Sequence, residues 1–143
     1  MPATLDVPQG LPRPLTTAAL DLLERCEDEL LVALRSDDTA ERYVHAHLAA
    51  LRAGAALVAV HGRPTSPRRS GPRSVWEMLP AFDPALQAWA ERFAATAPLR
   101  SAVEAGRTGV VDEAAAEELL TDAEQFHRVV ESLLGLSALP LAG

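Results

Sequence analysis

Apolar residues in this chain recur at steps of three and four residues, and no stretch alternates for long enough to form a strand. That spacing places apolar side chains on one side of an α-helix, as in amphipathic helices packed around a core. Composition points the same way, because 27 Ala and 22 Leu among 143 residues favour helix and the chain contains no Ile. The sequence therefore predicts an all-α fold, an up-and-down bundle of four to five helices of which one is short.

Two long helices are predicted in the first half of the chain. The first runs over about residues 15–36 and could be capped by Thr16 or Thr17. Asp38 then starts a second helix that reaches about residue 61, with Glu41 three residues after it in the arrangement of a capping box.

The second helix carries small apolar residues on several faces, so we expect it at the centre of the bundle. Its larger apolar residues form a stripe that other helices of the same chain would bury: Val44, Leu48, Leu51, Ala55 and Val58. Alanines occupy the remaining faces: Ala46, Ala49, Ala50, Ala53 and Ala56. An alanine surface is flat and loses no rotamers on contact, so it predicts a homodimer formed through this helix. Alternatively, the aromatic helix of the second half covers the alanines within one chain.

Capping signals divide the second half. Residues 74–77 (Ser-Val-Trp-Glu) form a capping box before a short helix that Pro80 ends. Asp83 followed by proline starts a longer helix with an aromatic stripe, which Pro98 is expected to break or kink.

The last helix is predicted from Asp112, or from nearby Thr108, to about residue 134, and Gly135 fits a C-terminal cap. Its acidic residues are expected to form a solvated face. Its buried side is expected to comprise Ala115, Leu119, Ala123, Phe126, Val130 and Leu133.

Two tails and one loop surround and interrupt the predicted domain. Residues 1–14 are proline-rich and residues 136–143 follow the last helix, so both are interpreted as tails around a bundle over 15–135. Residues 62–73 contain Pro, Gly, Ser and Arg without an acid, which indicates a flexible loop. Its arginines could meet RNA phosphates or an acidic protein partner, or the loop could be a soluble linker only. These arginines are Arg63, Arg68, Arg69 and Arg73.

Three segments carry a resemblance to a known family: residues 40–58 (AERYVHAHLAALRAGAALV), 73–79 (RSVWEML) and 122–126 (DAEQF). In this order they resemble small bacterial HEPN-type domains, over about residues 15–135. The resemblance implies a helical bundle that usually dimerises. It also implies either a ribonuclease of toxin–antitoxin or defence systems, or an inactive binding or scaffold module.

The ribonuclease signature of that family is an Arg, four to six residues, and a His, and Arg42 and His47 match its spacing. Arg clamps phosphate and His moves protons near neutral pH, so the pair is a candidate for metal-independent cleavage with the RNA 2′-hydroxyl as nucleophile. His45 is an alternative to His47, because three residues after Arg42 it lies closer to the same face of the helix than His47 does. In the structural interpretation, His47 is a hydrogen-bonded core residue and Arg42 covers the start of the helix.

No metal or cofactor site is predicted. His45 and His47 face nearly opposite sides of a helix, His127 is expected to be structural or solvated, and Cys26 is expected to be a buried apolar residue. The net charge of −7 argues against a protein that coats nucleic acid over its whole surface. The chain is expected to be cytoplasmic, with no membrane contact.

Three functions fit these patterns. The preferred one is a non-catalytic, dimeric HEPN-like interaction module that contacts RNA or a protein through the arginine-rich loop. The alternatives are a metal-independent endoribonuclease and a structural adaptor with no nucleic-acid role.

Overall fold

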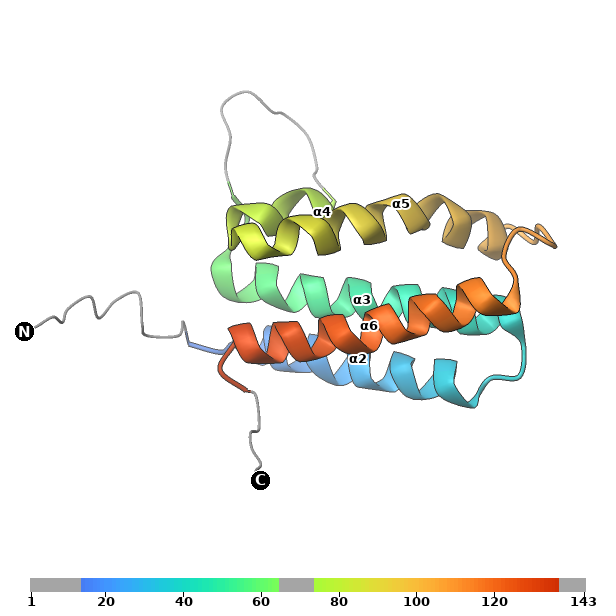
Figure 1. Cartoon of the computed structure of the whole chain (residues 1–143). Helices are drawn as coiled ribbons and strands as arrows, with labels where there is room; N and C mark the ends of the chain where they lie inside the picture. Colours follow the sequence, from blue (N-terminus) through green and yellow to red (C-terminus); the bar gives the residue numbers. More distant parts are fainter. Residues whose placement is uncertain (1–13, 65–73, 137–143) are drawn as a thin grey trace, which may run out of the picture.

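Consecutive long helices lie side by side and run antiparallel to one another (Figure 1). The structure is a computed structural model that describes residues 14–64 and 74–136. The long helices are α2 (Thr17–Arg35), α3 (Thr39–His61), α5 (Gln87–Glu104) and α6 (Glu113–Leu133). Between α3 and α5 lie the short α4 (Val75–Met78) and two 3₁₀ turns, η2 (Leu79–Ala81) and η3 (Pro84–Leu86). The described residues contain no strand, which confirms the predicted all-α bundle.

The helix α3 lies at the centre of the bundle, as expected from its alanine-rich sequence. It contacts α2, α4, α5 and α6. In Figure 1, α4 and α5 lie on one side of α3, α2 lies on the opposite side, and α6 runs in front.

Most of the predicted helix ends are confirmed by their hydrogen bonds. The hydroxyl of Thr16 accepts from the amide of Ala19 at 3.0 Å, and the carboxylate of Asp112 accepts from Ala115 at 2.8 Å. Ser74 begins α4 with both hydrogen bonds of a capping box. Gly135 ends α6 at a φ of 75°, where Leu136 donates to the carbonyl of Glu131 at 2.7 Å in a Schellman arrangement.

One local prediction is wrong, and of the break or kink expected at Pro98 the break does not occur. The side chain of Asp38 makes no capping hydrogen bond to α3. The hydroxyl of Ser36 takes part at this helix start instead, since it donates a hydrogen bond to the carboxylate of Glu41 and accepts one from the amide of Asp38. Pro98 does not end α5, which continues to Glu104. The carbonyl of Ala94 loses its helical donor there, and this residue is exposed, so water can replace the missing bond.

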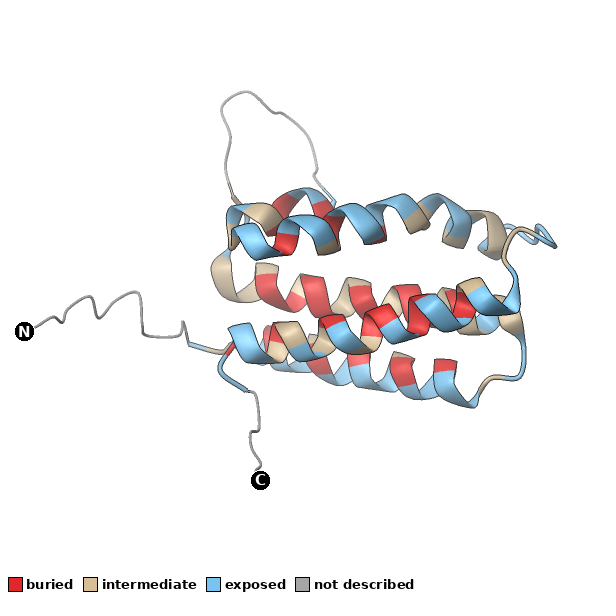
Figure 2. Cartoon of the chain, in the orientation of Figure 1, coloured by how far each residue is buried: buried red, intermediate tan, exposed pale blue. Residues whose placement is uncertain are grey.

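The prediction of which α3 face is buried is also wrong. The alanines of α3 have no exposed surface, and they are packed inside the chain: Ala46, Ala49, Ala50, Ala53 and Ala56. The larger residues lie on a face that is only partly covered: Val44, Leu48, Leu51, Ala55 and Val58. Small side chains let neighbouring helices approach the α3 backbone, so the alanines are buried within one chain and are not free for a second copy (Figure 2).

An aromatic cluster fills the space between α4, α5 and α6. Phe93 lies at the centre, with ring centroids 5.1 Å from Trp76, 6.1 Å from Trp89 and 5.2 Å from Phe126. Such ring pairs stabilise a core beyond the area that they bury. Cys26 on α2 is fully buried on the other side of α3, as predicted.

The length and composition of α3 would suffice to cross a membrane, which is true of no other helix in the described part of the chain. Half of its most apolar window is buried in the bundle. The central helix of a soluble domain meets the same criterion, and α3 packs against α2, α4, α5 and α6.

Candidate functional site

Arg42 is held by the end of the preceding helix. Its Nε donates to the carbonyl of Ala33 at 3.2 Å and its Nη2 donates to the carbonyl of Ser36 at 2.6 Å. Its Nη1 also contacts the carboxylate of Glu117 on α6 at 3.3 Å. The guanidinium therefore binds carbonyls at the C-terminal end of α2 and links them to α6.

His47 points in another direction, into the aromatic core. Only 1% of its surface is exposed, and its Nε2 lies 2.9 Å from the carbonyl of Phe93 on α5. Trp76 and Phe93 meet the ring edge-on, at centroid distances of 6.0 and 6.3 Å. Because a carbonyl can only accept, Nε2 carries the hydrogen and Nδ1 does not.

The pKa of His47 is lowered below its usual 6.5, mainly because burial disfavours the charged ring. The hydrogen bond to Phe93 and the charge of Glu104 oppose this shift, whereas the charge of Arg100 adds to it. Nδ1 is buried and has no hydrogen-bond partner, so a second proton would find no acceptor. The ring is thus a neutral core group without access to a substrate.

His45 faces a third neighbour. Its Nδ1 contacts the carboxylate of Glu29 on α2 at 2.5 Å. Arg42, His45 and His47 therefore have separate partners among the described residues, on the end of α2, the middle of α2 and α5. The spacing that matched the ribonuclease signature does not bring their functional groups to a common position.

Only one arginine of the predicted loop lies within the described residues. Arg63 is exposed, and its Nη1 approaches the sulfur of Met78 at 3.7 Å. Arg68, Arg69 and Arg73 lie outside the described residues. The described part of the chain stops at Pro64 and resumes at Ser74.

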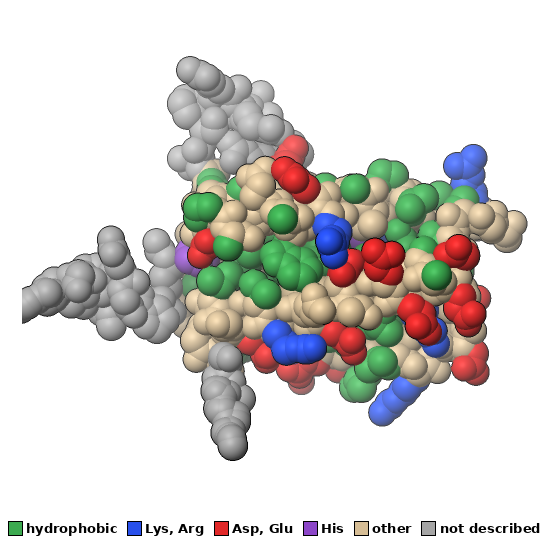
Figure 3. Space-filling model, in the orientation of Figure 1, with side chains coloured by type: hydrophobic (Ala, Val, Ile, Leu, Met, Phe, Trp, Pro, Cys, Tyr) green, Lys and Arg blue, Asp and Glu red, His purple; other side chains and the backbone are tan. Residues whose placement is uncertain are grey.

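A buried carboxylate joins α5 to α6. Asp122 accepts a hydrogen bond from Arg92 at 2.7 Å, and this pair crosses a seam where Figure 3 shows hydrophobic side chains between the two helices. Burial raises the pKa of Asp122, although Arg92 opposes the shift. The pair explains why an aspartate occurs on the buried side of α6, which the apolar pattern alone did not predict.

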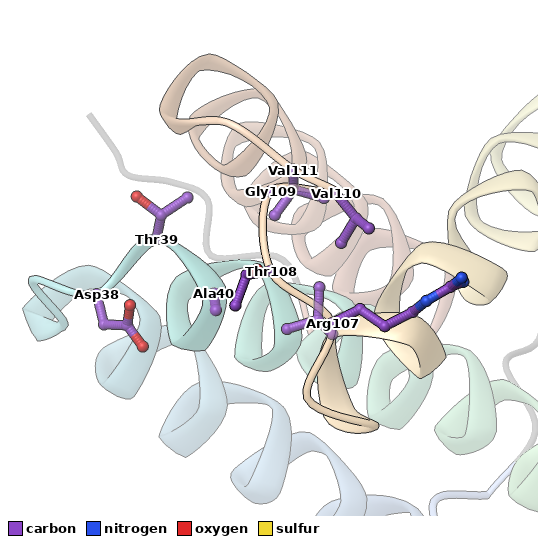
Figure 4. Close-up of a pocket in the computed structure, with 9 residues that line it drawn as sticks. Asp38, Thr39, Ala40, Arg107, Thr108, Gly109, Val110 and Val111 are labelled. Carbon is purple, nitrogen blue, oxygen red and sulfur yellow. The ribbon is translucent and has the colours of Figure 1, made fainter.

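A cavity of about 230 Å³ lies where the α5–α6 connection passes the start of α3 (Figure 4). Val103, Val110 and Val111 supply much of its lining. Asp38 and Thr39 lie at one side, whereas Arg107 extends to the other side. Its polar groups do not converge, as they would in a built ligand site.

Sequence reasoning missed a cluster of three potential ligands. Glu27 on α2 lies beside His127 and Glu131 on α6, and one ligand atom from each lies within 4.8 Å of the others. Glu131 follows His127 by one helical turn, so its place beside His127 is set by α6 itself. No local pattern could indicate Glu27, which is distant in the chain.

A comparison with known protein families agrees with this fold, in which α4, α5 and α6 pack around the central α3. A family model of SAV_6107-like HEPN domains matches residues 33–131. The chain belongs to this HEPN family. The match confirms the resemblance and spans all of α3, α4 and α5 and nearly all of α6. No curated protein and no solved structure matches the chain.

Proposed function

We propose that this chain is a non-catalytic, homodimeric HEPN module of the cytoplasm that binds a partner through its arginine-rich segment. The observation that carries the proposal is the partly covered apolar face of α3. We name this face the outer stripe and define it as Val44, Leu48, Leu51, Ala55 and Val58.

The outer stripe lies about 180° around the helix from the middle of the buried alanine face. Leu51 and Val58 pack partly against the core, whereas Leu48 does not. A helix that is apolar on all sides is normally covered on all sides. The side of α3 that carries the outer stripe is only partly covered, which favours a partner there.

The spacing of the outer stripe favours a second copy of the chain as that partner. Its steps of four, three, four and three residues repeat the a and d positions of a coiled-coil seam, over about 21 Å of helix. A stripe of this kind is self-complementary, because two copies related by a twofold axis present the same residues to each other.

Arg52 lies one turn after Leu48, beside the outer stripe. Within the described residues it forms no ion pair, and its Nε is buried without a hydrogen-bond partner. The remaining nitrogens of the guanidinium can donate hydrogen bonds to a carboxylate of a second copy, which supports pairing at this face.

The dimer can be tested by placing a charge in the outer stripe. We expect Leu48→Glu to yield monomers in sedimentation velocity, because it puts an unpaired charge into the pair of seams, while the fold survives because Leu48 lies outside the core. Leu31→Glu is the matched control, since Leu31 is 45% exposed on α2. A Leu48→Glu protein that sediments like the wild type would place the interface elsewhere.

The absence of catalysis is supported by what Arg42 and His47 already do. Arg42 is bound to two carbonyls and a carboxylate, and His47 is buried with a neutral ring. A phosphate clamp and a general base both need a free face toward the substrate.

We expect no metal-independent RNA cleavage above a heat-inactivated control in a chelator-treated assay. Cleavage by the wild type that is lost in both Arg42→Ala and His47→Ala, with circular dichroism unchanged, would favour the ribonuclease alternative.

The arginine-rich segment 63–73 is proposed as the surface that binds a partner, with RNA phosphate as the chemistry to test first. It carries four arginines and no acid, in a chain with a net charge of −7. Phosphate contacts release counterions, so the affinity for single-stranded RNA, measured by gel shift, should fall steeply between low and moderate salt. Replacing Arg68 and Arg69 with Ser should lower this affinity further. Binding that ignores both salt and these substitutions would favour the structural adaptor.

A further inference from the structure

Three side chains from two helices converge on the face of the bundle shared by α2 and α6. The Nε2 atom of His127 lies 3.7 Å from Oε2 of Glu27 and 3.6 Å from Oε2 of Glu131. His127 and Glu131 are one helical turn apart on α6, so the fold of that helix fixes their spacing. Glu27 reaches them from α2, and both helices pack against α3.

The imidazole of His127 is held in place without a hydrogen bond to either acid. Its Nε2 is buried and has no hydrogen-bond partner, and the side chain is only 13% exposed. The pair of His45 and Glu29 shows what a direct contact looks like in the same chain, because those two groups close to 2.5 Å. The ion-pair contacts of Glu27 and Glu131 with Nε2 of His127 are more than 1 Å longer than this contact, which leaves room for an ion among the three groups.

We infer that Glu27, His127 and Glu131 bind a divalent transition-metal ion of the zinc class. Zinc bonds to imidazole nitrogen and carboxylate oxygen at about 2.0–2.2 Å, which places ligand atoms of a tetrahedron about 3.4 Å apart. The observed separations of 3.6 and 3.7 Å are slightly longer than that value, and a small rotation of the glutamate side chains would remove the difference.

The donor set selects the class of metal. One nitrogen and two carboxylate oxygens suit zinc, cobalt or nickel, whereas calcium and magnesium prefer oxygen ligands throughout. Cys26 is not a ligand, because its buried thiol lies outside the cluster. With three protein ligands, a fourth position is left for water or an added ligand.

Burial of the three residues is graded, which suits entry of an ion from solvent. The side chain of Glu27 is 57% exposed, that of Glu131 is 30% exposed, and that of His127 is 13% exposed. The bound ion would join α2 directly to α6. It should therefore raise the melting temperature, because metal binds the folded chain and not the separated ligands.

The test is titration of chelator-treated, tag-free protein with zinc chloride in a calorimeter, with the melting temperature measured in parallel. We expect one zinc per chain and a higher melting temperature. Glu27→Gln should weaken binding by about tenfold or more without unfolding the protein, because the residue is exposed. His127→Gln should abolish the one-to-one binding.

His45→Gln is the matched control, because His45 contacts one glutamate and lacks a third ligand. It should leave the stoichiometry and affinity unchanged. The proposed site would be overturned by zinc that neither binds nor stabilises the wild type, or by binding that Glu27→Gln and His127→Gln leave intact. Preference for magnesium over zinc would overturn the assigned class. These outcomes do not depend on the oligomeric state.

Discussion

The two ring nitrogens of His47 have unequal surroundings, and this difference makes the residue sensitive to acid. Its lowered pKa means that the folded chain keeps the ring neutral at a pH where the unfolded chain, with a pKa near 6.5, binds a proton. In that range the unfolded state holds more protons, so the free energy of unfolding falls as the pH drops through 6.5.

We expect the stability advantage of the wild type over His47→Gln to be larger at pH 7.5 than at pH 5. The variant keeps a donor for the carbonyl of Phe93 but cannot titrate. Urea unfolding at both pH values measures the difference. An advantage that stays constant or grows on acidification would contradict a neutral, buried His47.

Cys26 gives a second residue-scale prediction. Burial, followed by the nearby carboxylates of Glu27, Glu131 and Glu29, raises the pKa of its thiol from 9.0 to about 12. Only the thiolate reacts with disulfide reagents, so the native thiol should be unreactive at pH 8 in metal-free buffer. One equivalent should react in denaturant. Fast reaction in native buffer would mean that α2 separates easily from α3.

The sequence could indicate the types of Arg42 and His47 but not their partners. Both bind backbone carbonyls, at Ala33, Ser36 and Phe93, and a carbonyl looks the same at every position of a sequence. Whether an Arg and a His form a site or serve two structural roles is therefore decided by packing. Only the structural interpretation of His47 made a statement about packing, and its burial and hydrogen bond confirm that statement.

At the scale of elements, α3 shows why periodicity can predict a helix and still fail to predict its buried face. Both its alanine face and its outer stripe are apolar, so the pattern alone does not choose between them. The neighbours decide, because α2, α4, α5 and α6 all pack close to one backbone. As a result, Ala49→Glu or Ala53→Glu would bury a charge inside the chain and cannot test the dimer.

Gly54 marks the closest of these approaches. A Cβ atom added at this position would lie 2.7 Å from Cγ1 of Val75 and 3.4 Å from the ring of Trp76. Gly→Ala within a helix normally stabilises by about 1 kcal/mol. Here the clash should reverse the sign, and we expect Gly54→Ala to destabilise the protein by about 1–2 kcal/mol in thermal or urea unfolding.

Val75→Ala provides the control for that prediction. In its background the added methyl group has space, so Gly54→Ala should cost little or should stabilise. A Gly54→Ala protein that is more stable than the wild type with Val75 in place would show that α4 does not rest on α3 at this point.

At the scale of the whole molecule, the bundle follows from signals that act locally. Thr16, Ser74, Asp112 and Gly135 each mark a helix end through their own short-range hydrogen bonds, and each was among the residues that the sequence indicated for that end. The cluster of Glu27, His127 and Glu131 depends on two helices meeting across the fold. The outer stripe also depends on the whole fold, because its exposure is set by how much of α3 the neighbouring helices cover.

The mass of the wild-type protein in solution tests the proposed dimer most directly. Two copies of the 15.2 kDa chain pair through their outer stripes in this proposal. Light scattering at micromolar concentration should therefore give about twice the mass of one chain, as expected for an isologous dimer. A mass of 15.2 kDa that does not rise with concentration would contradict it.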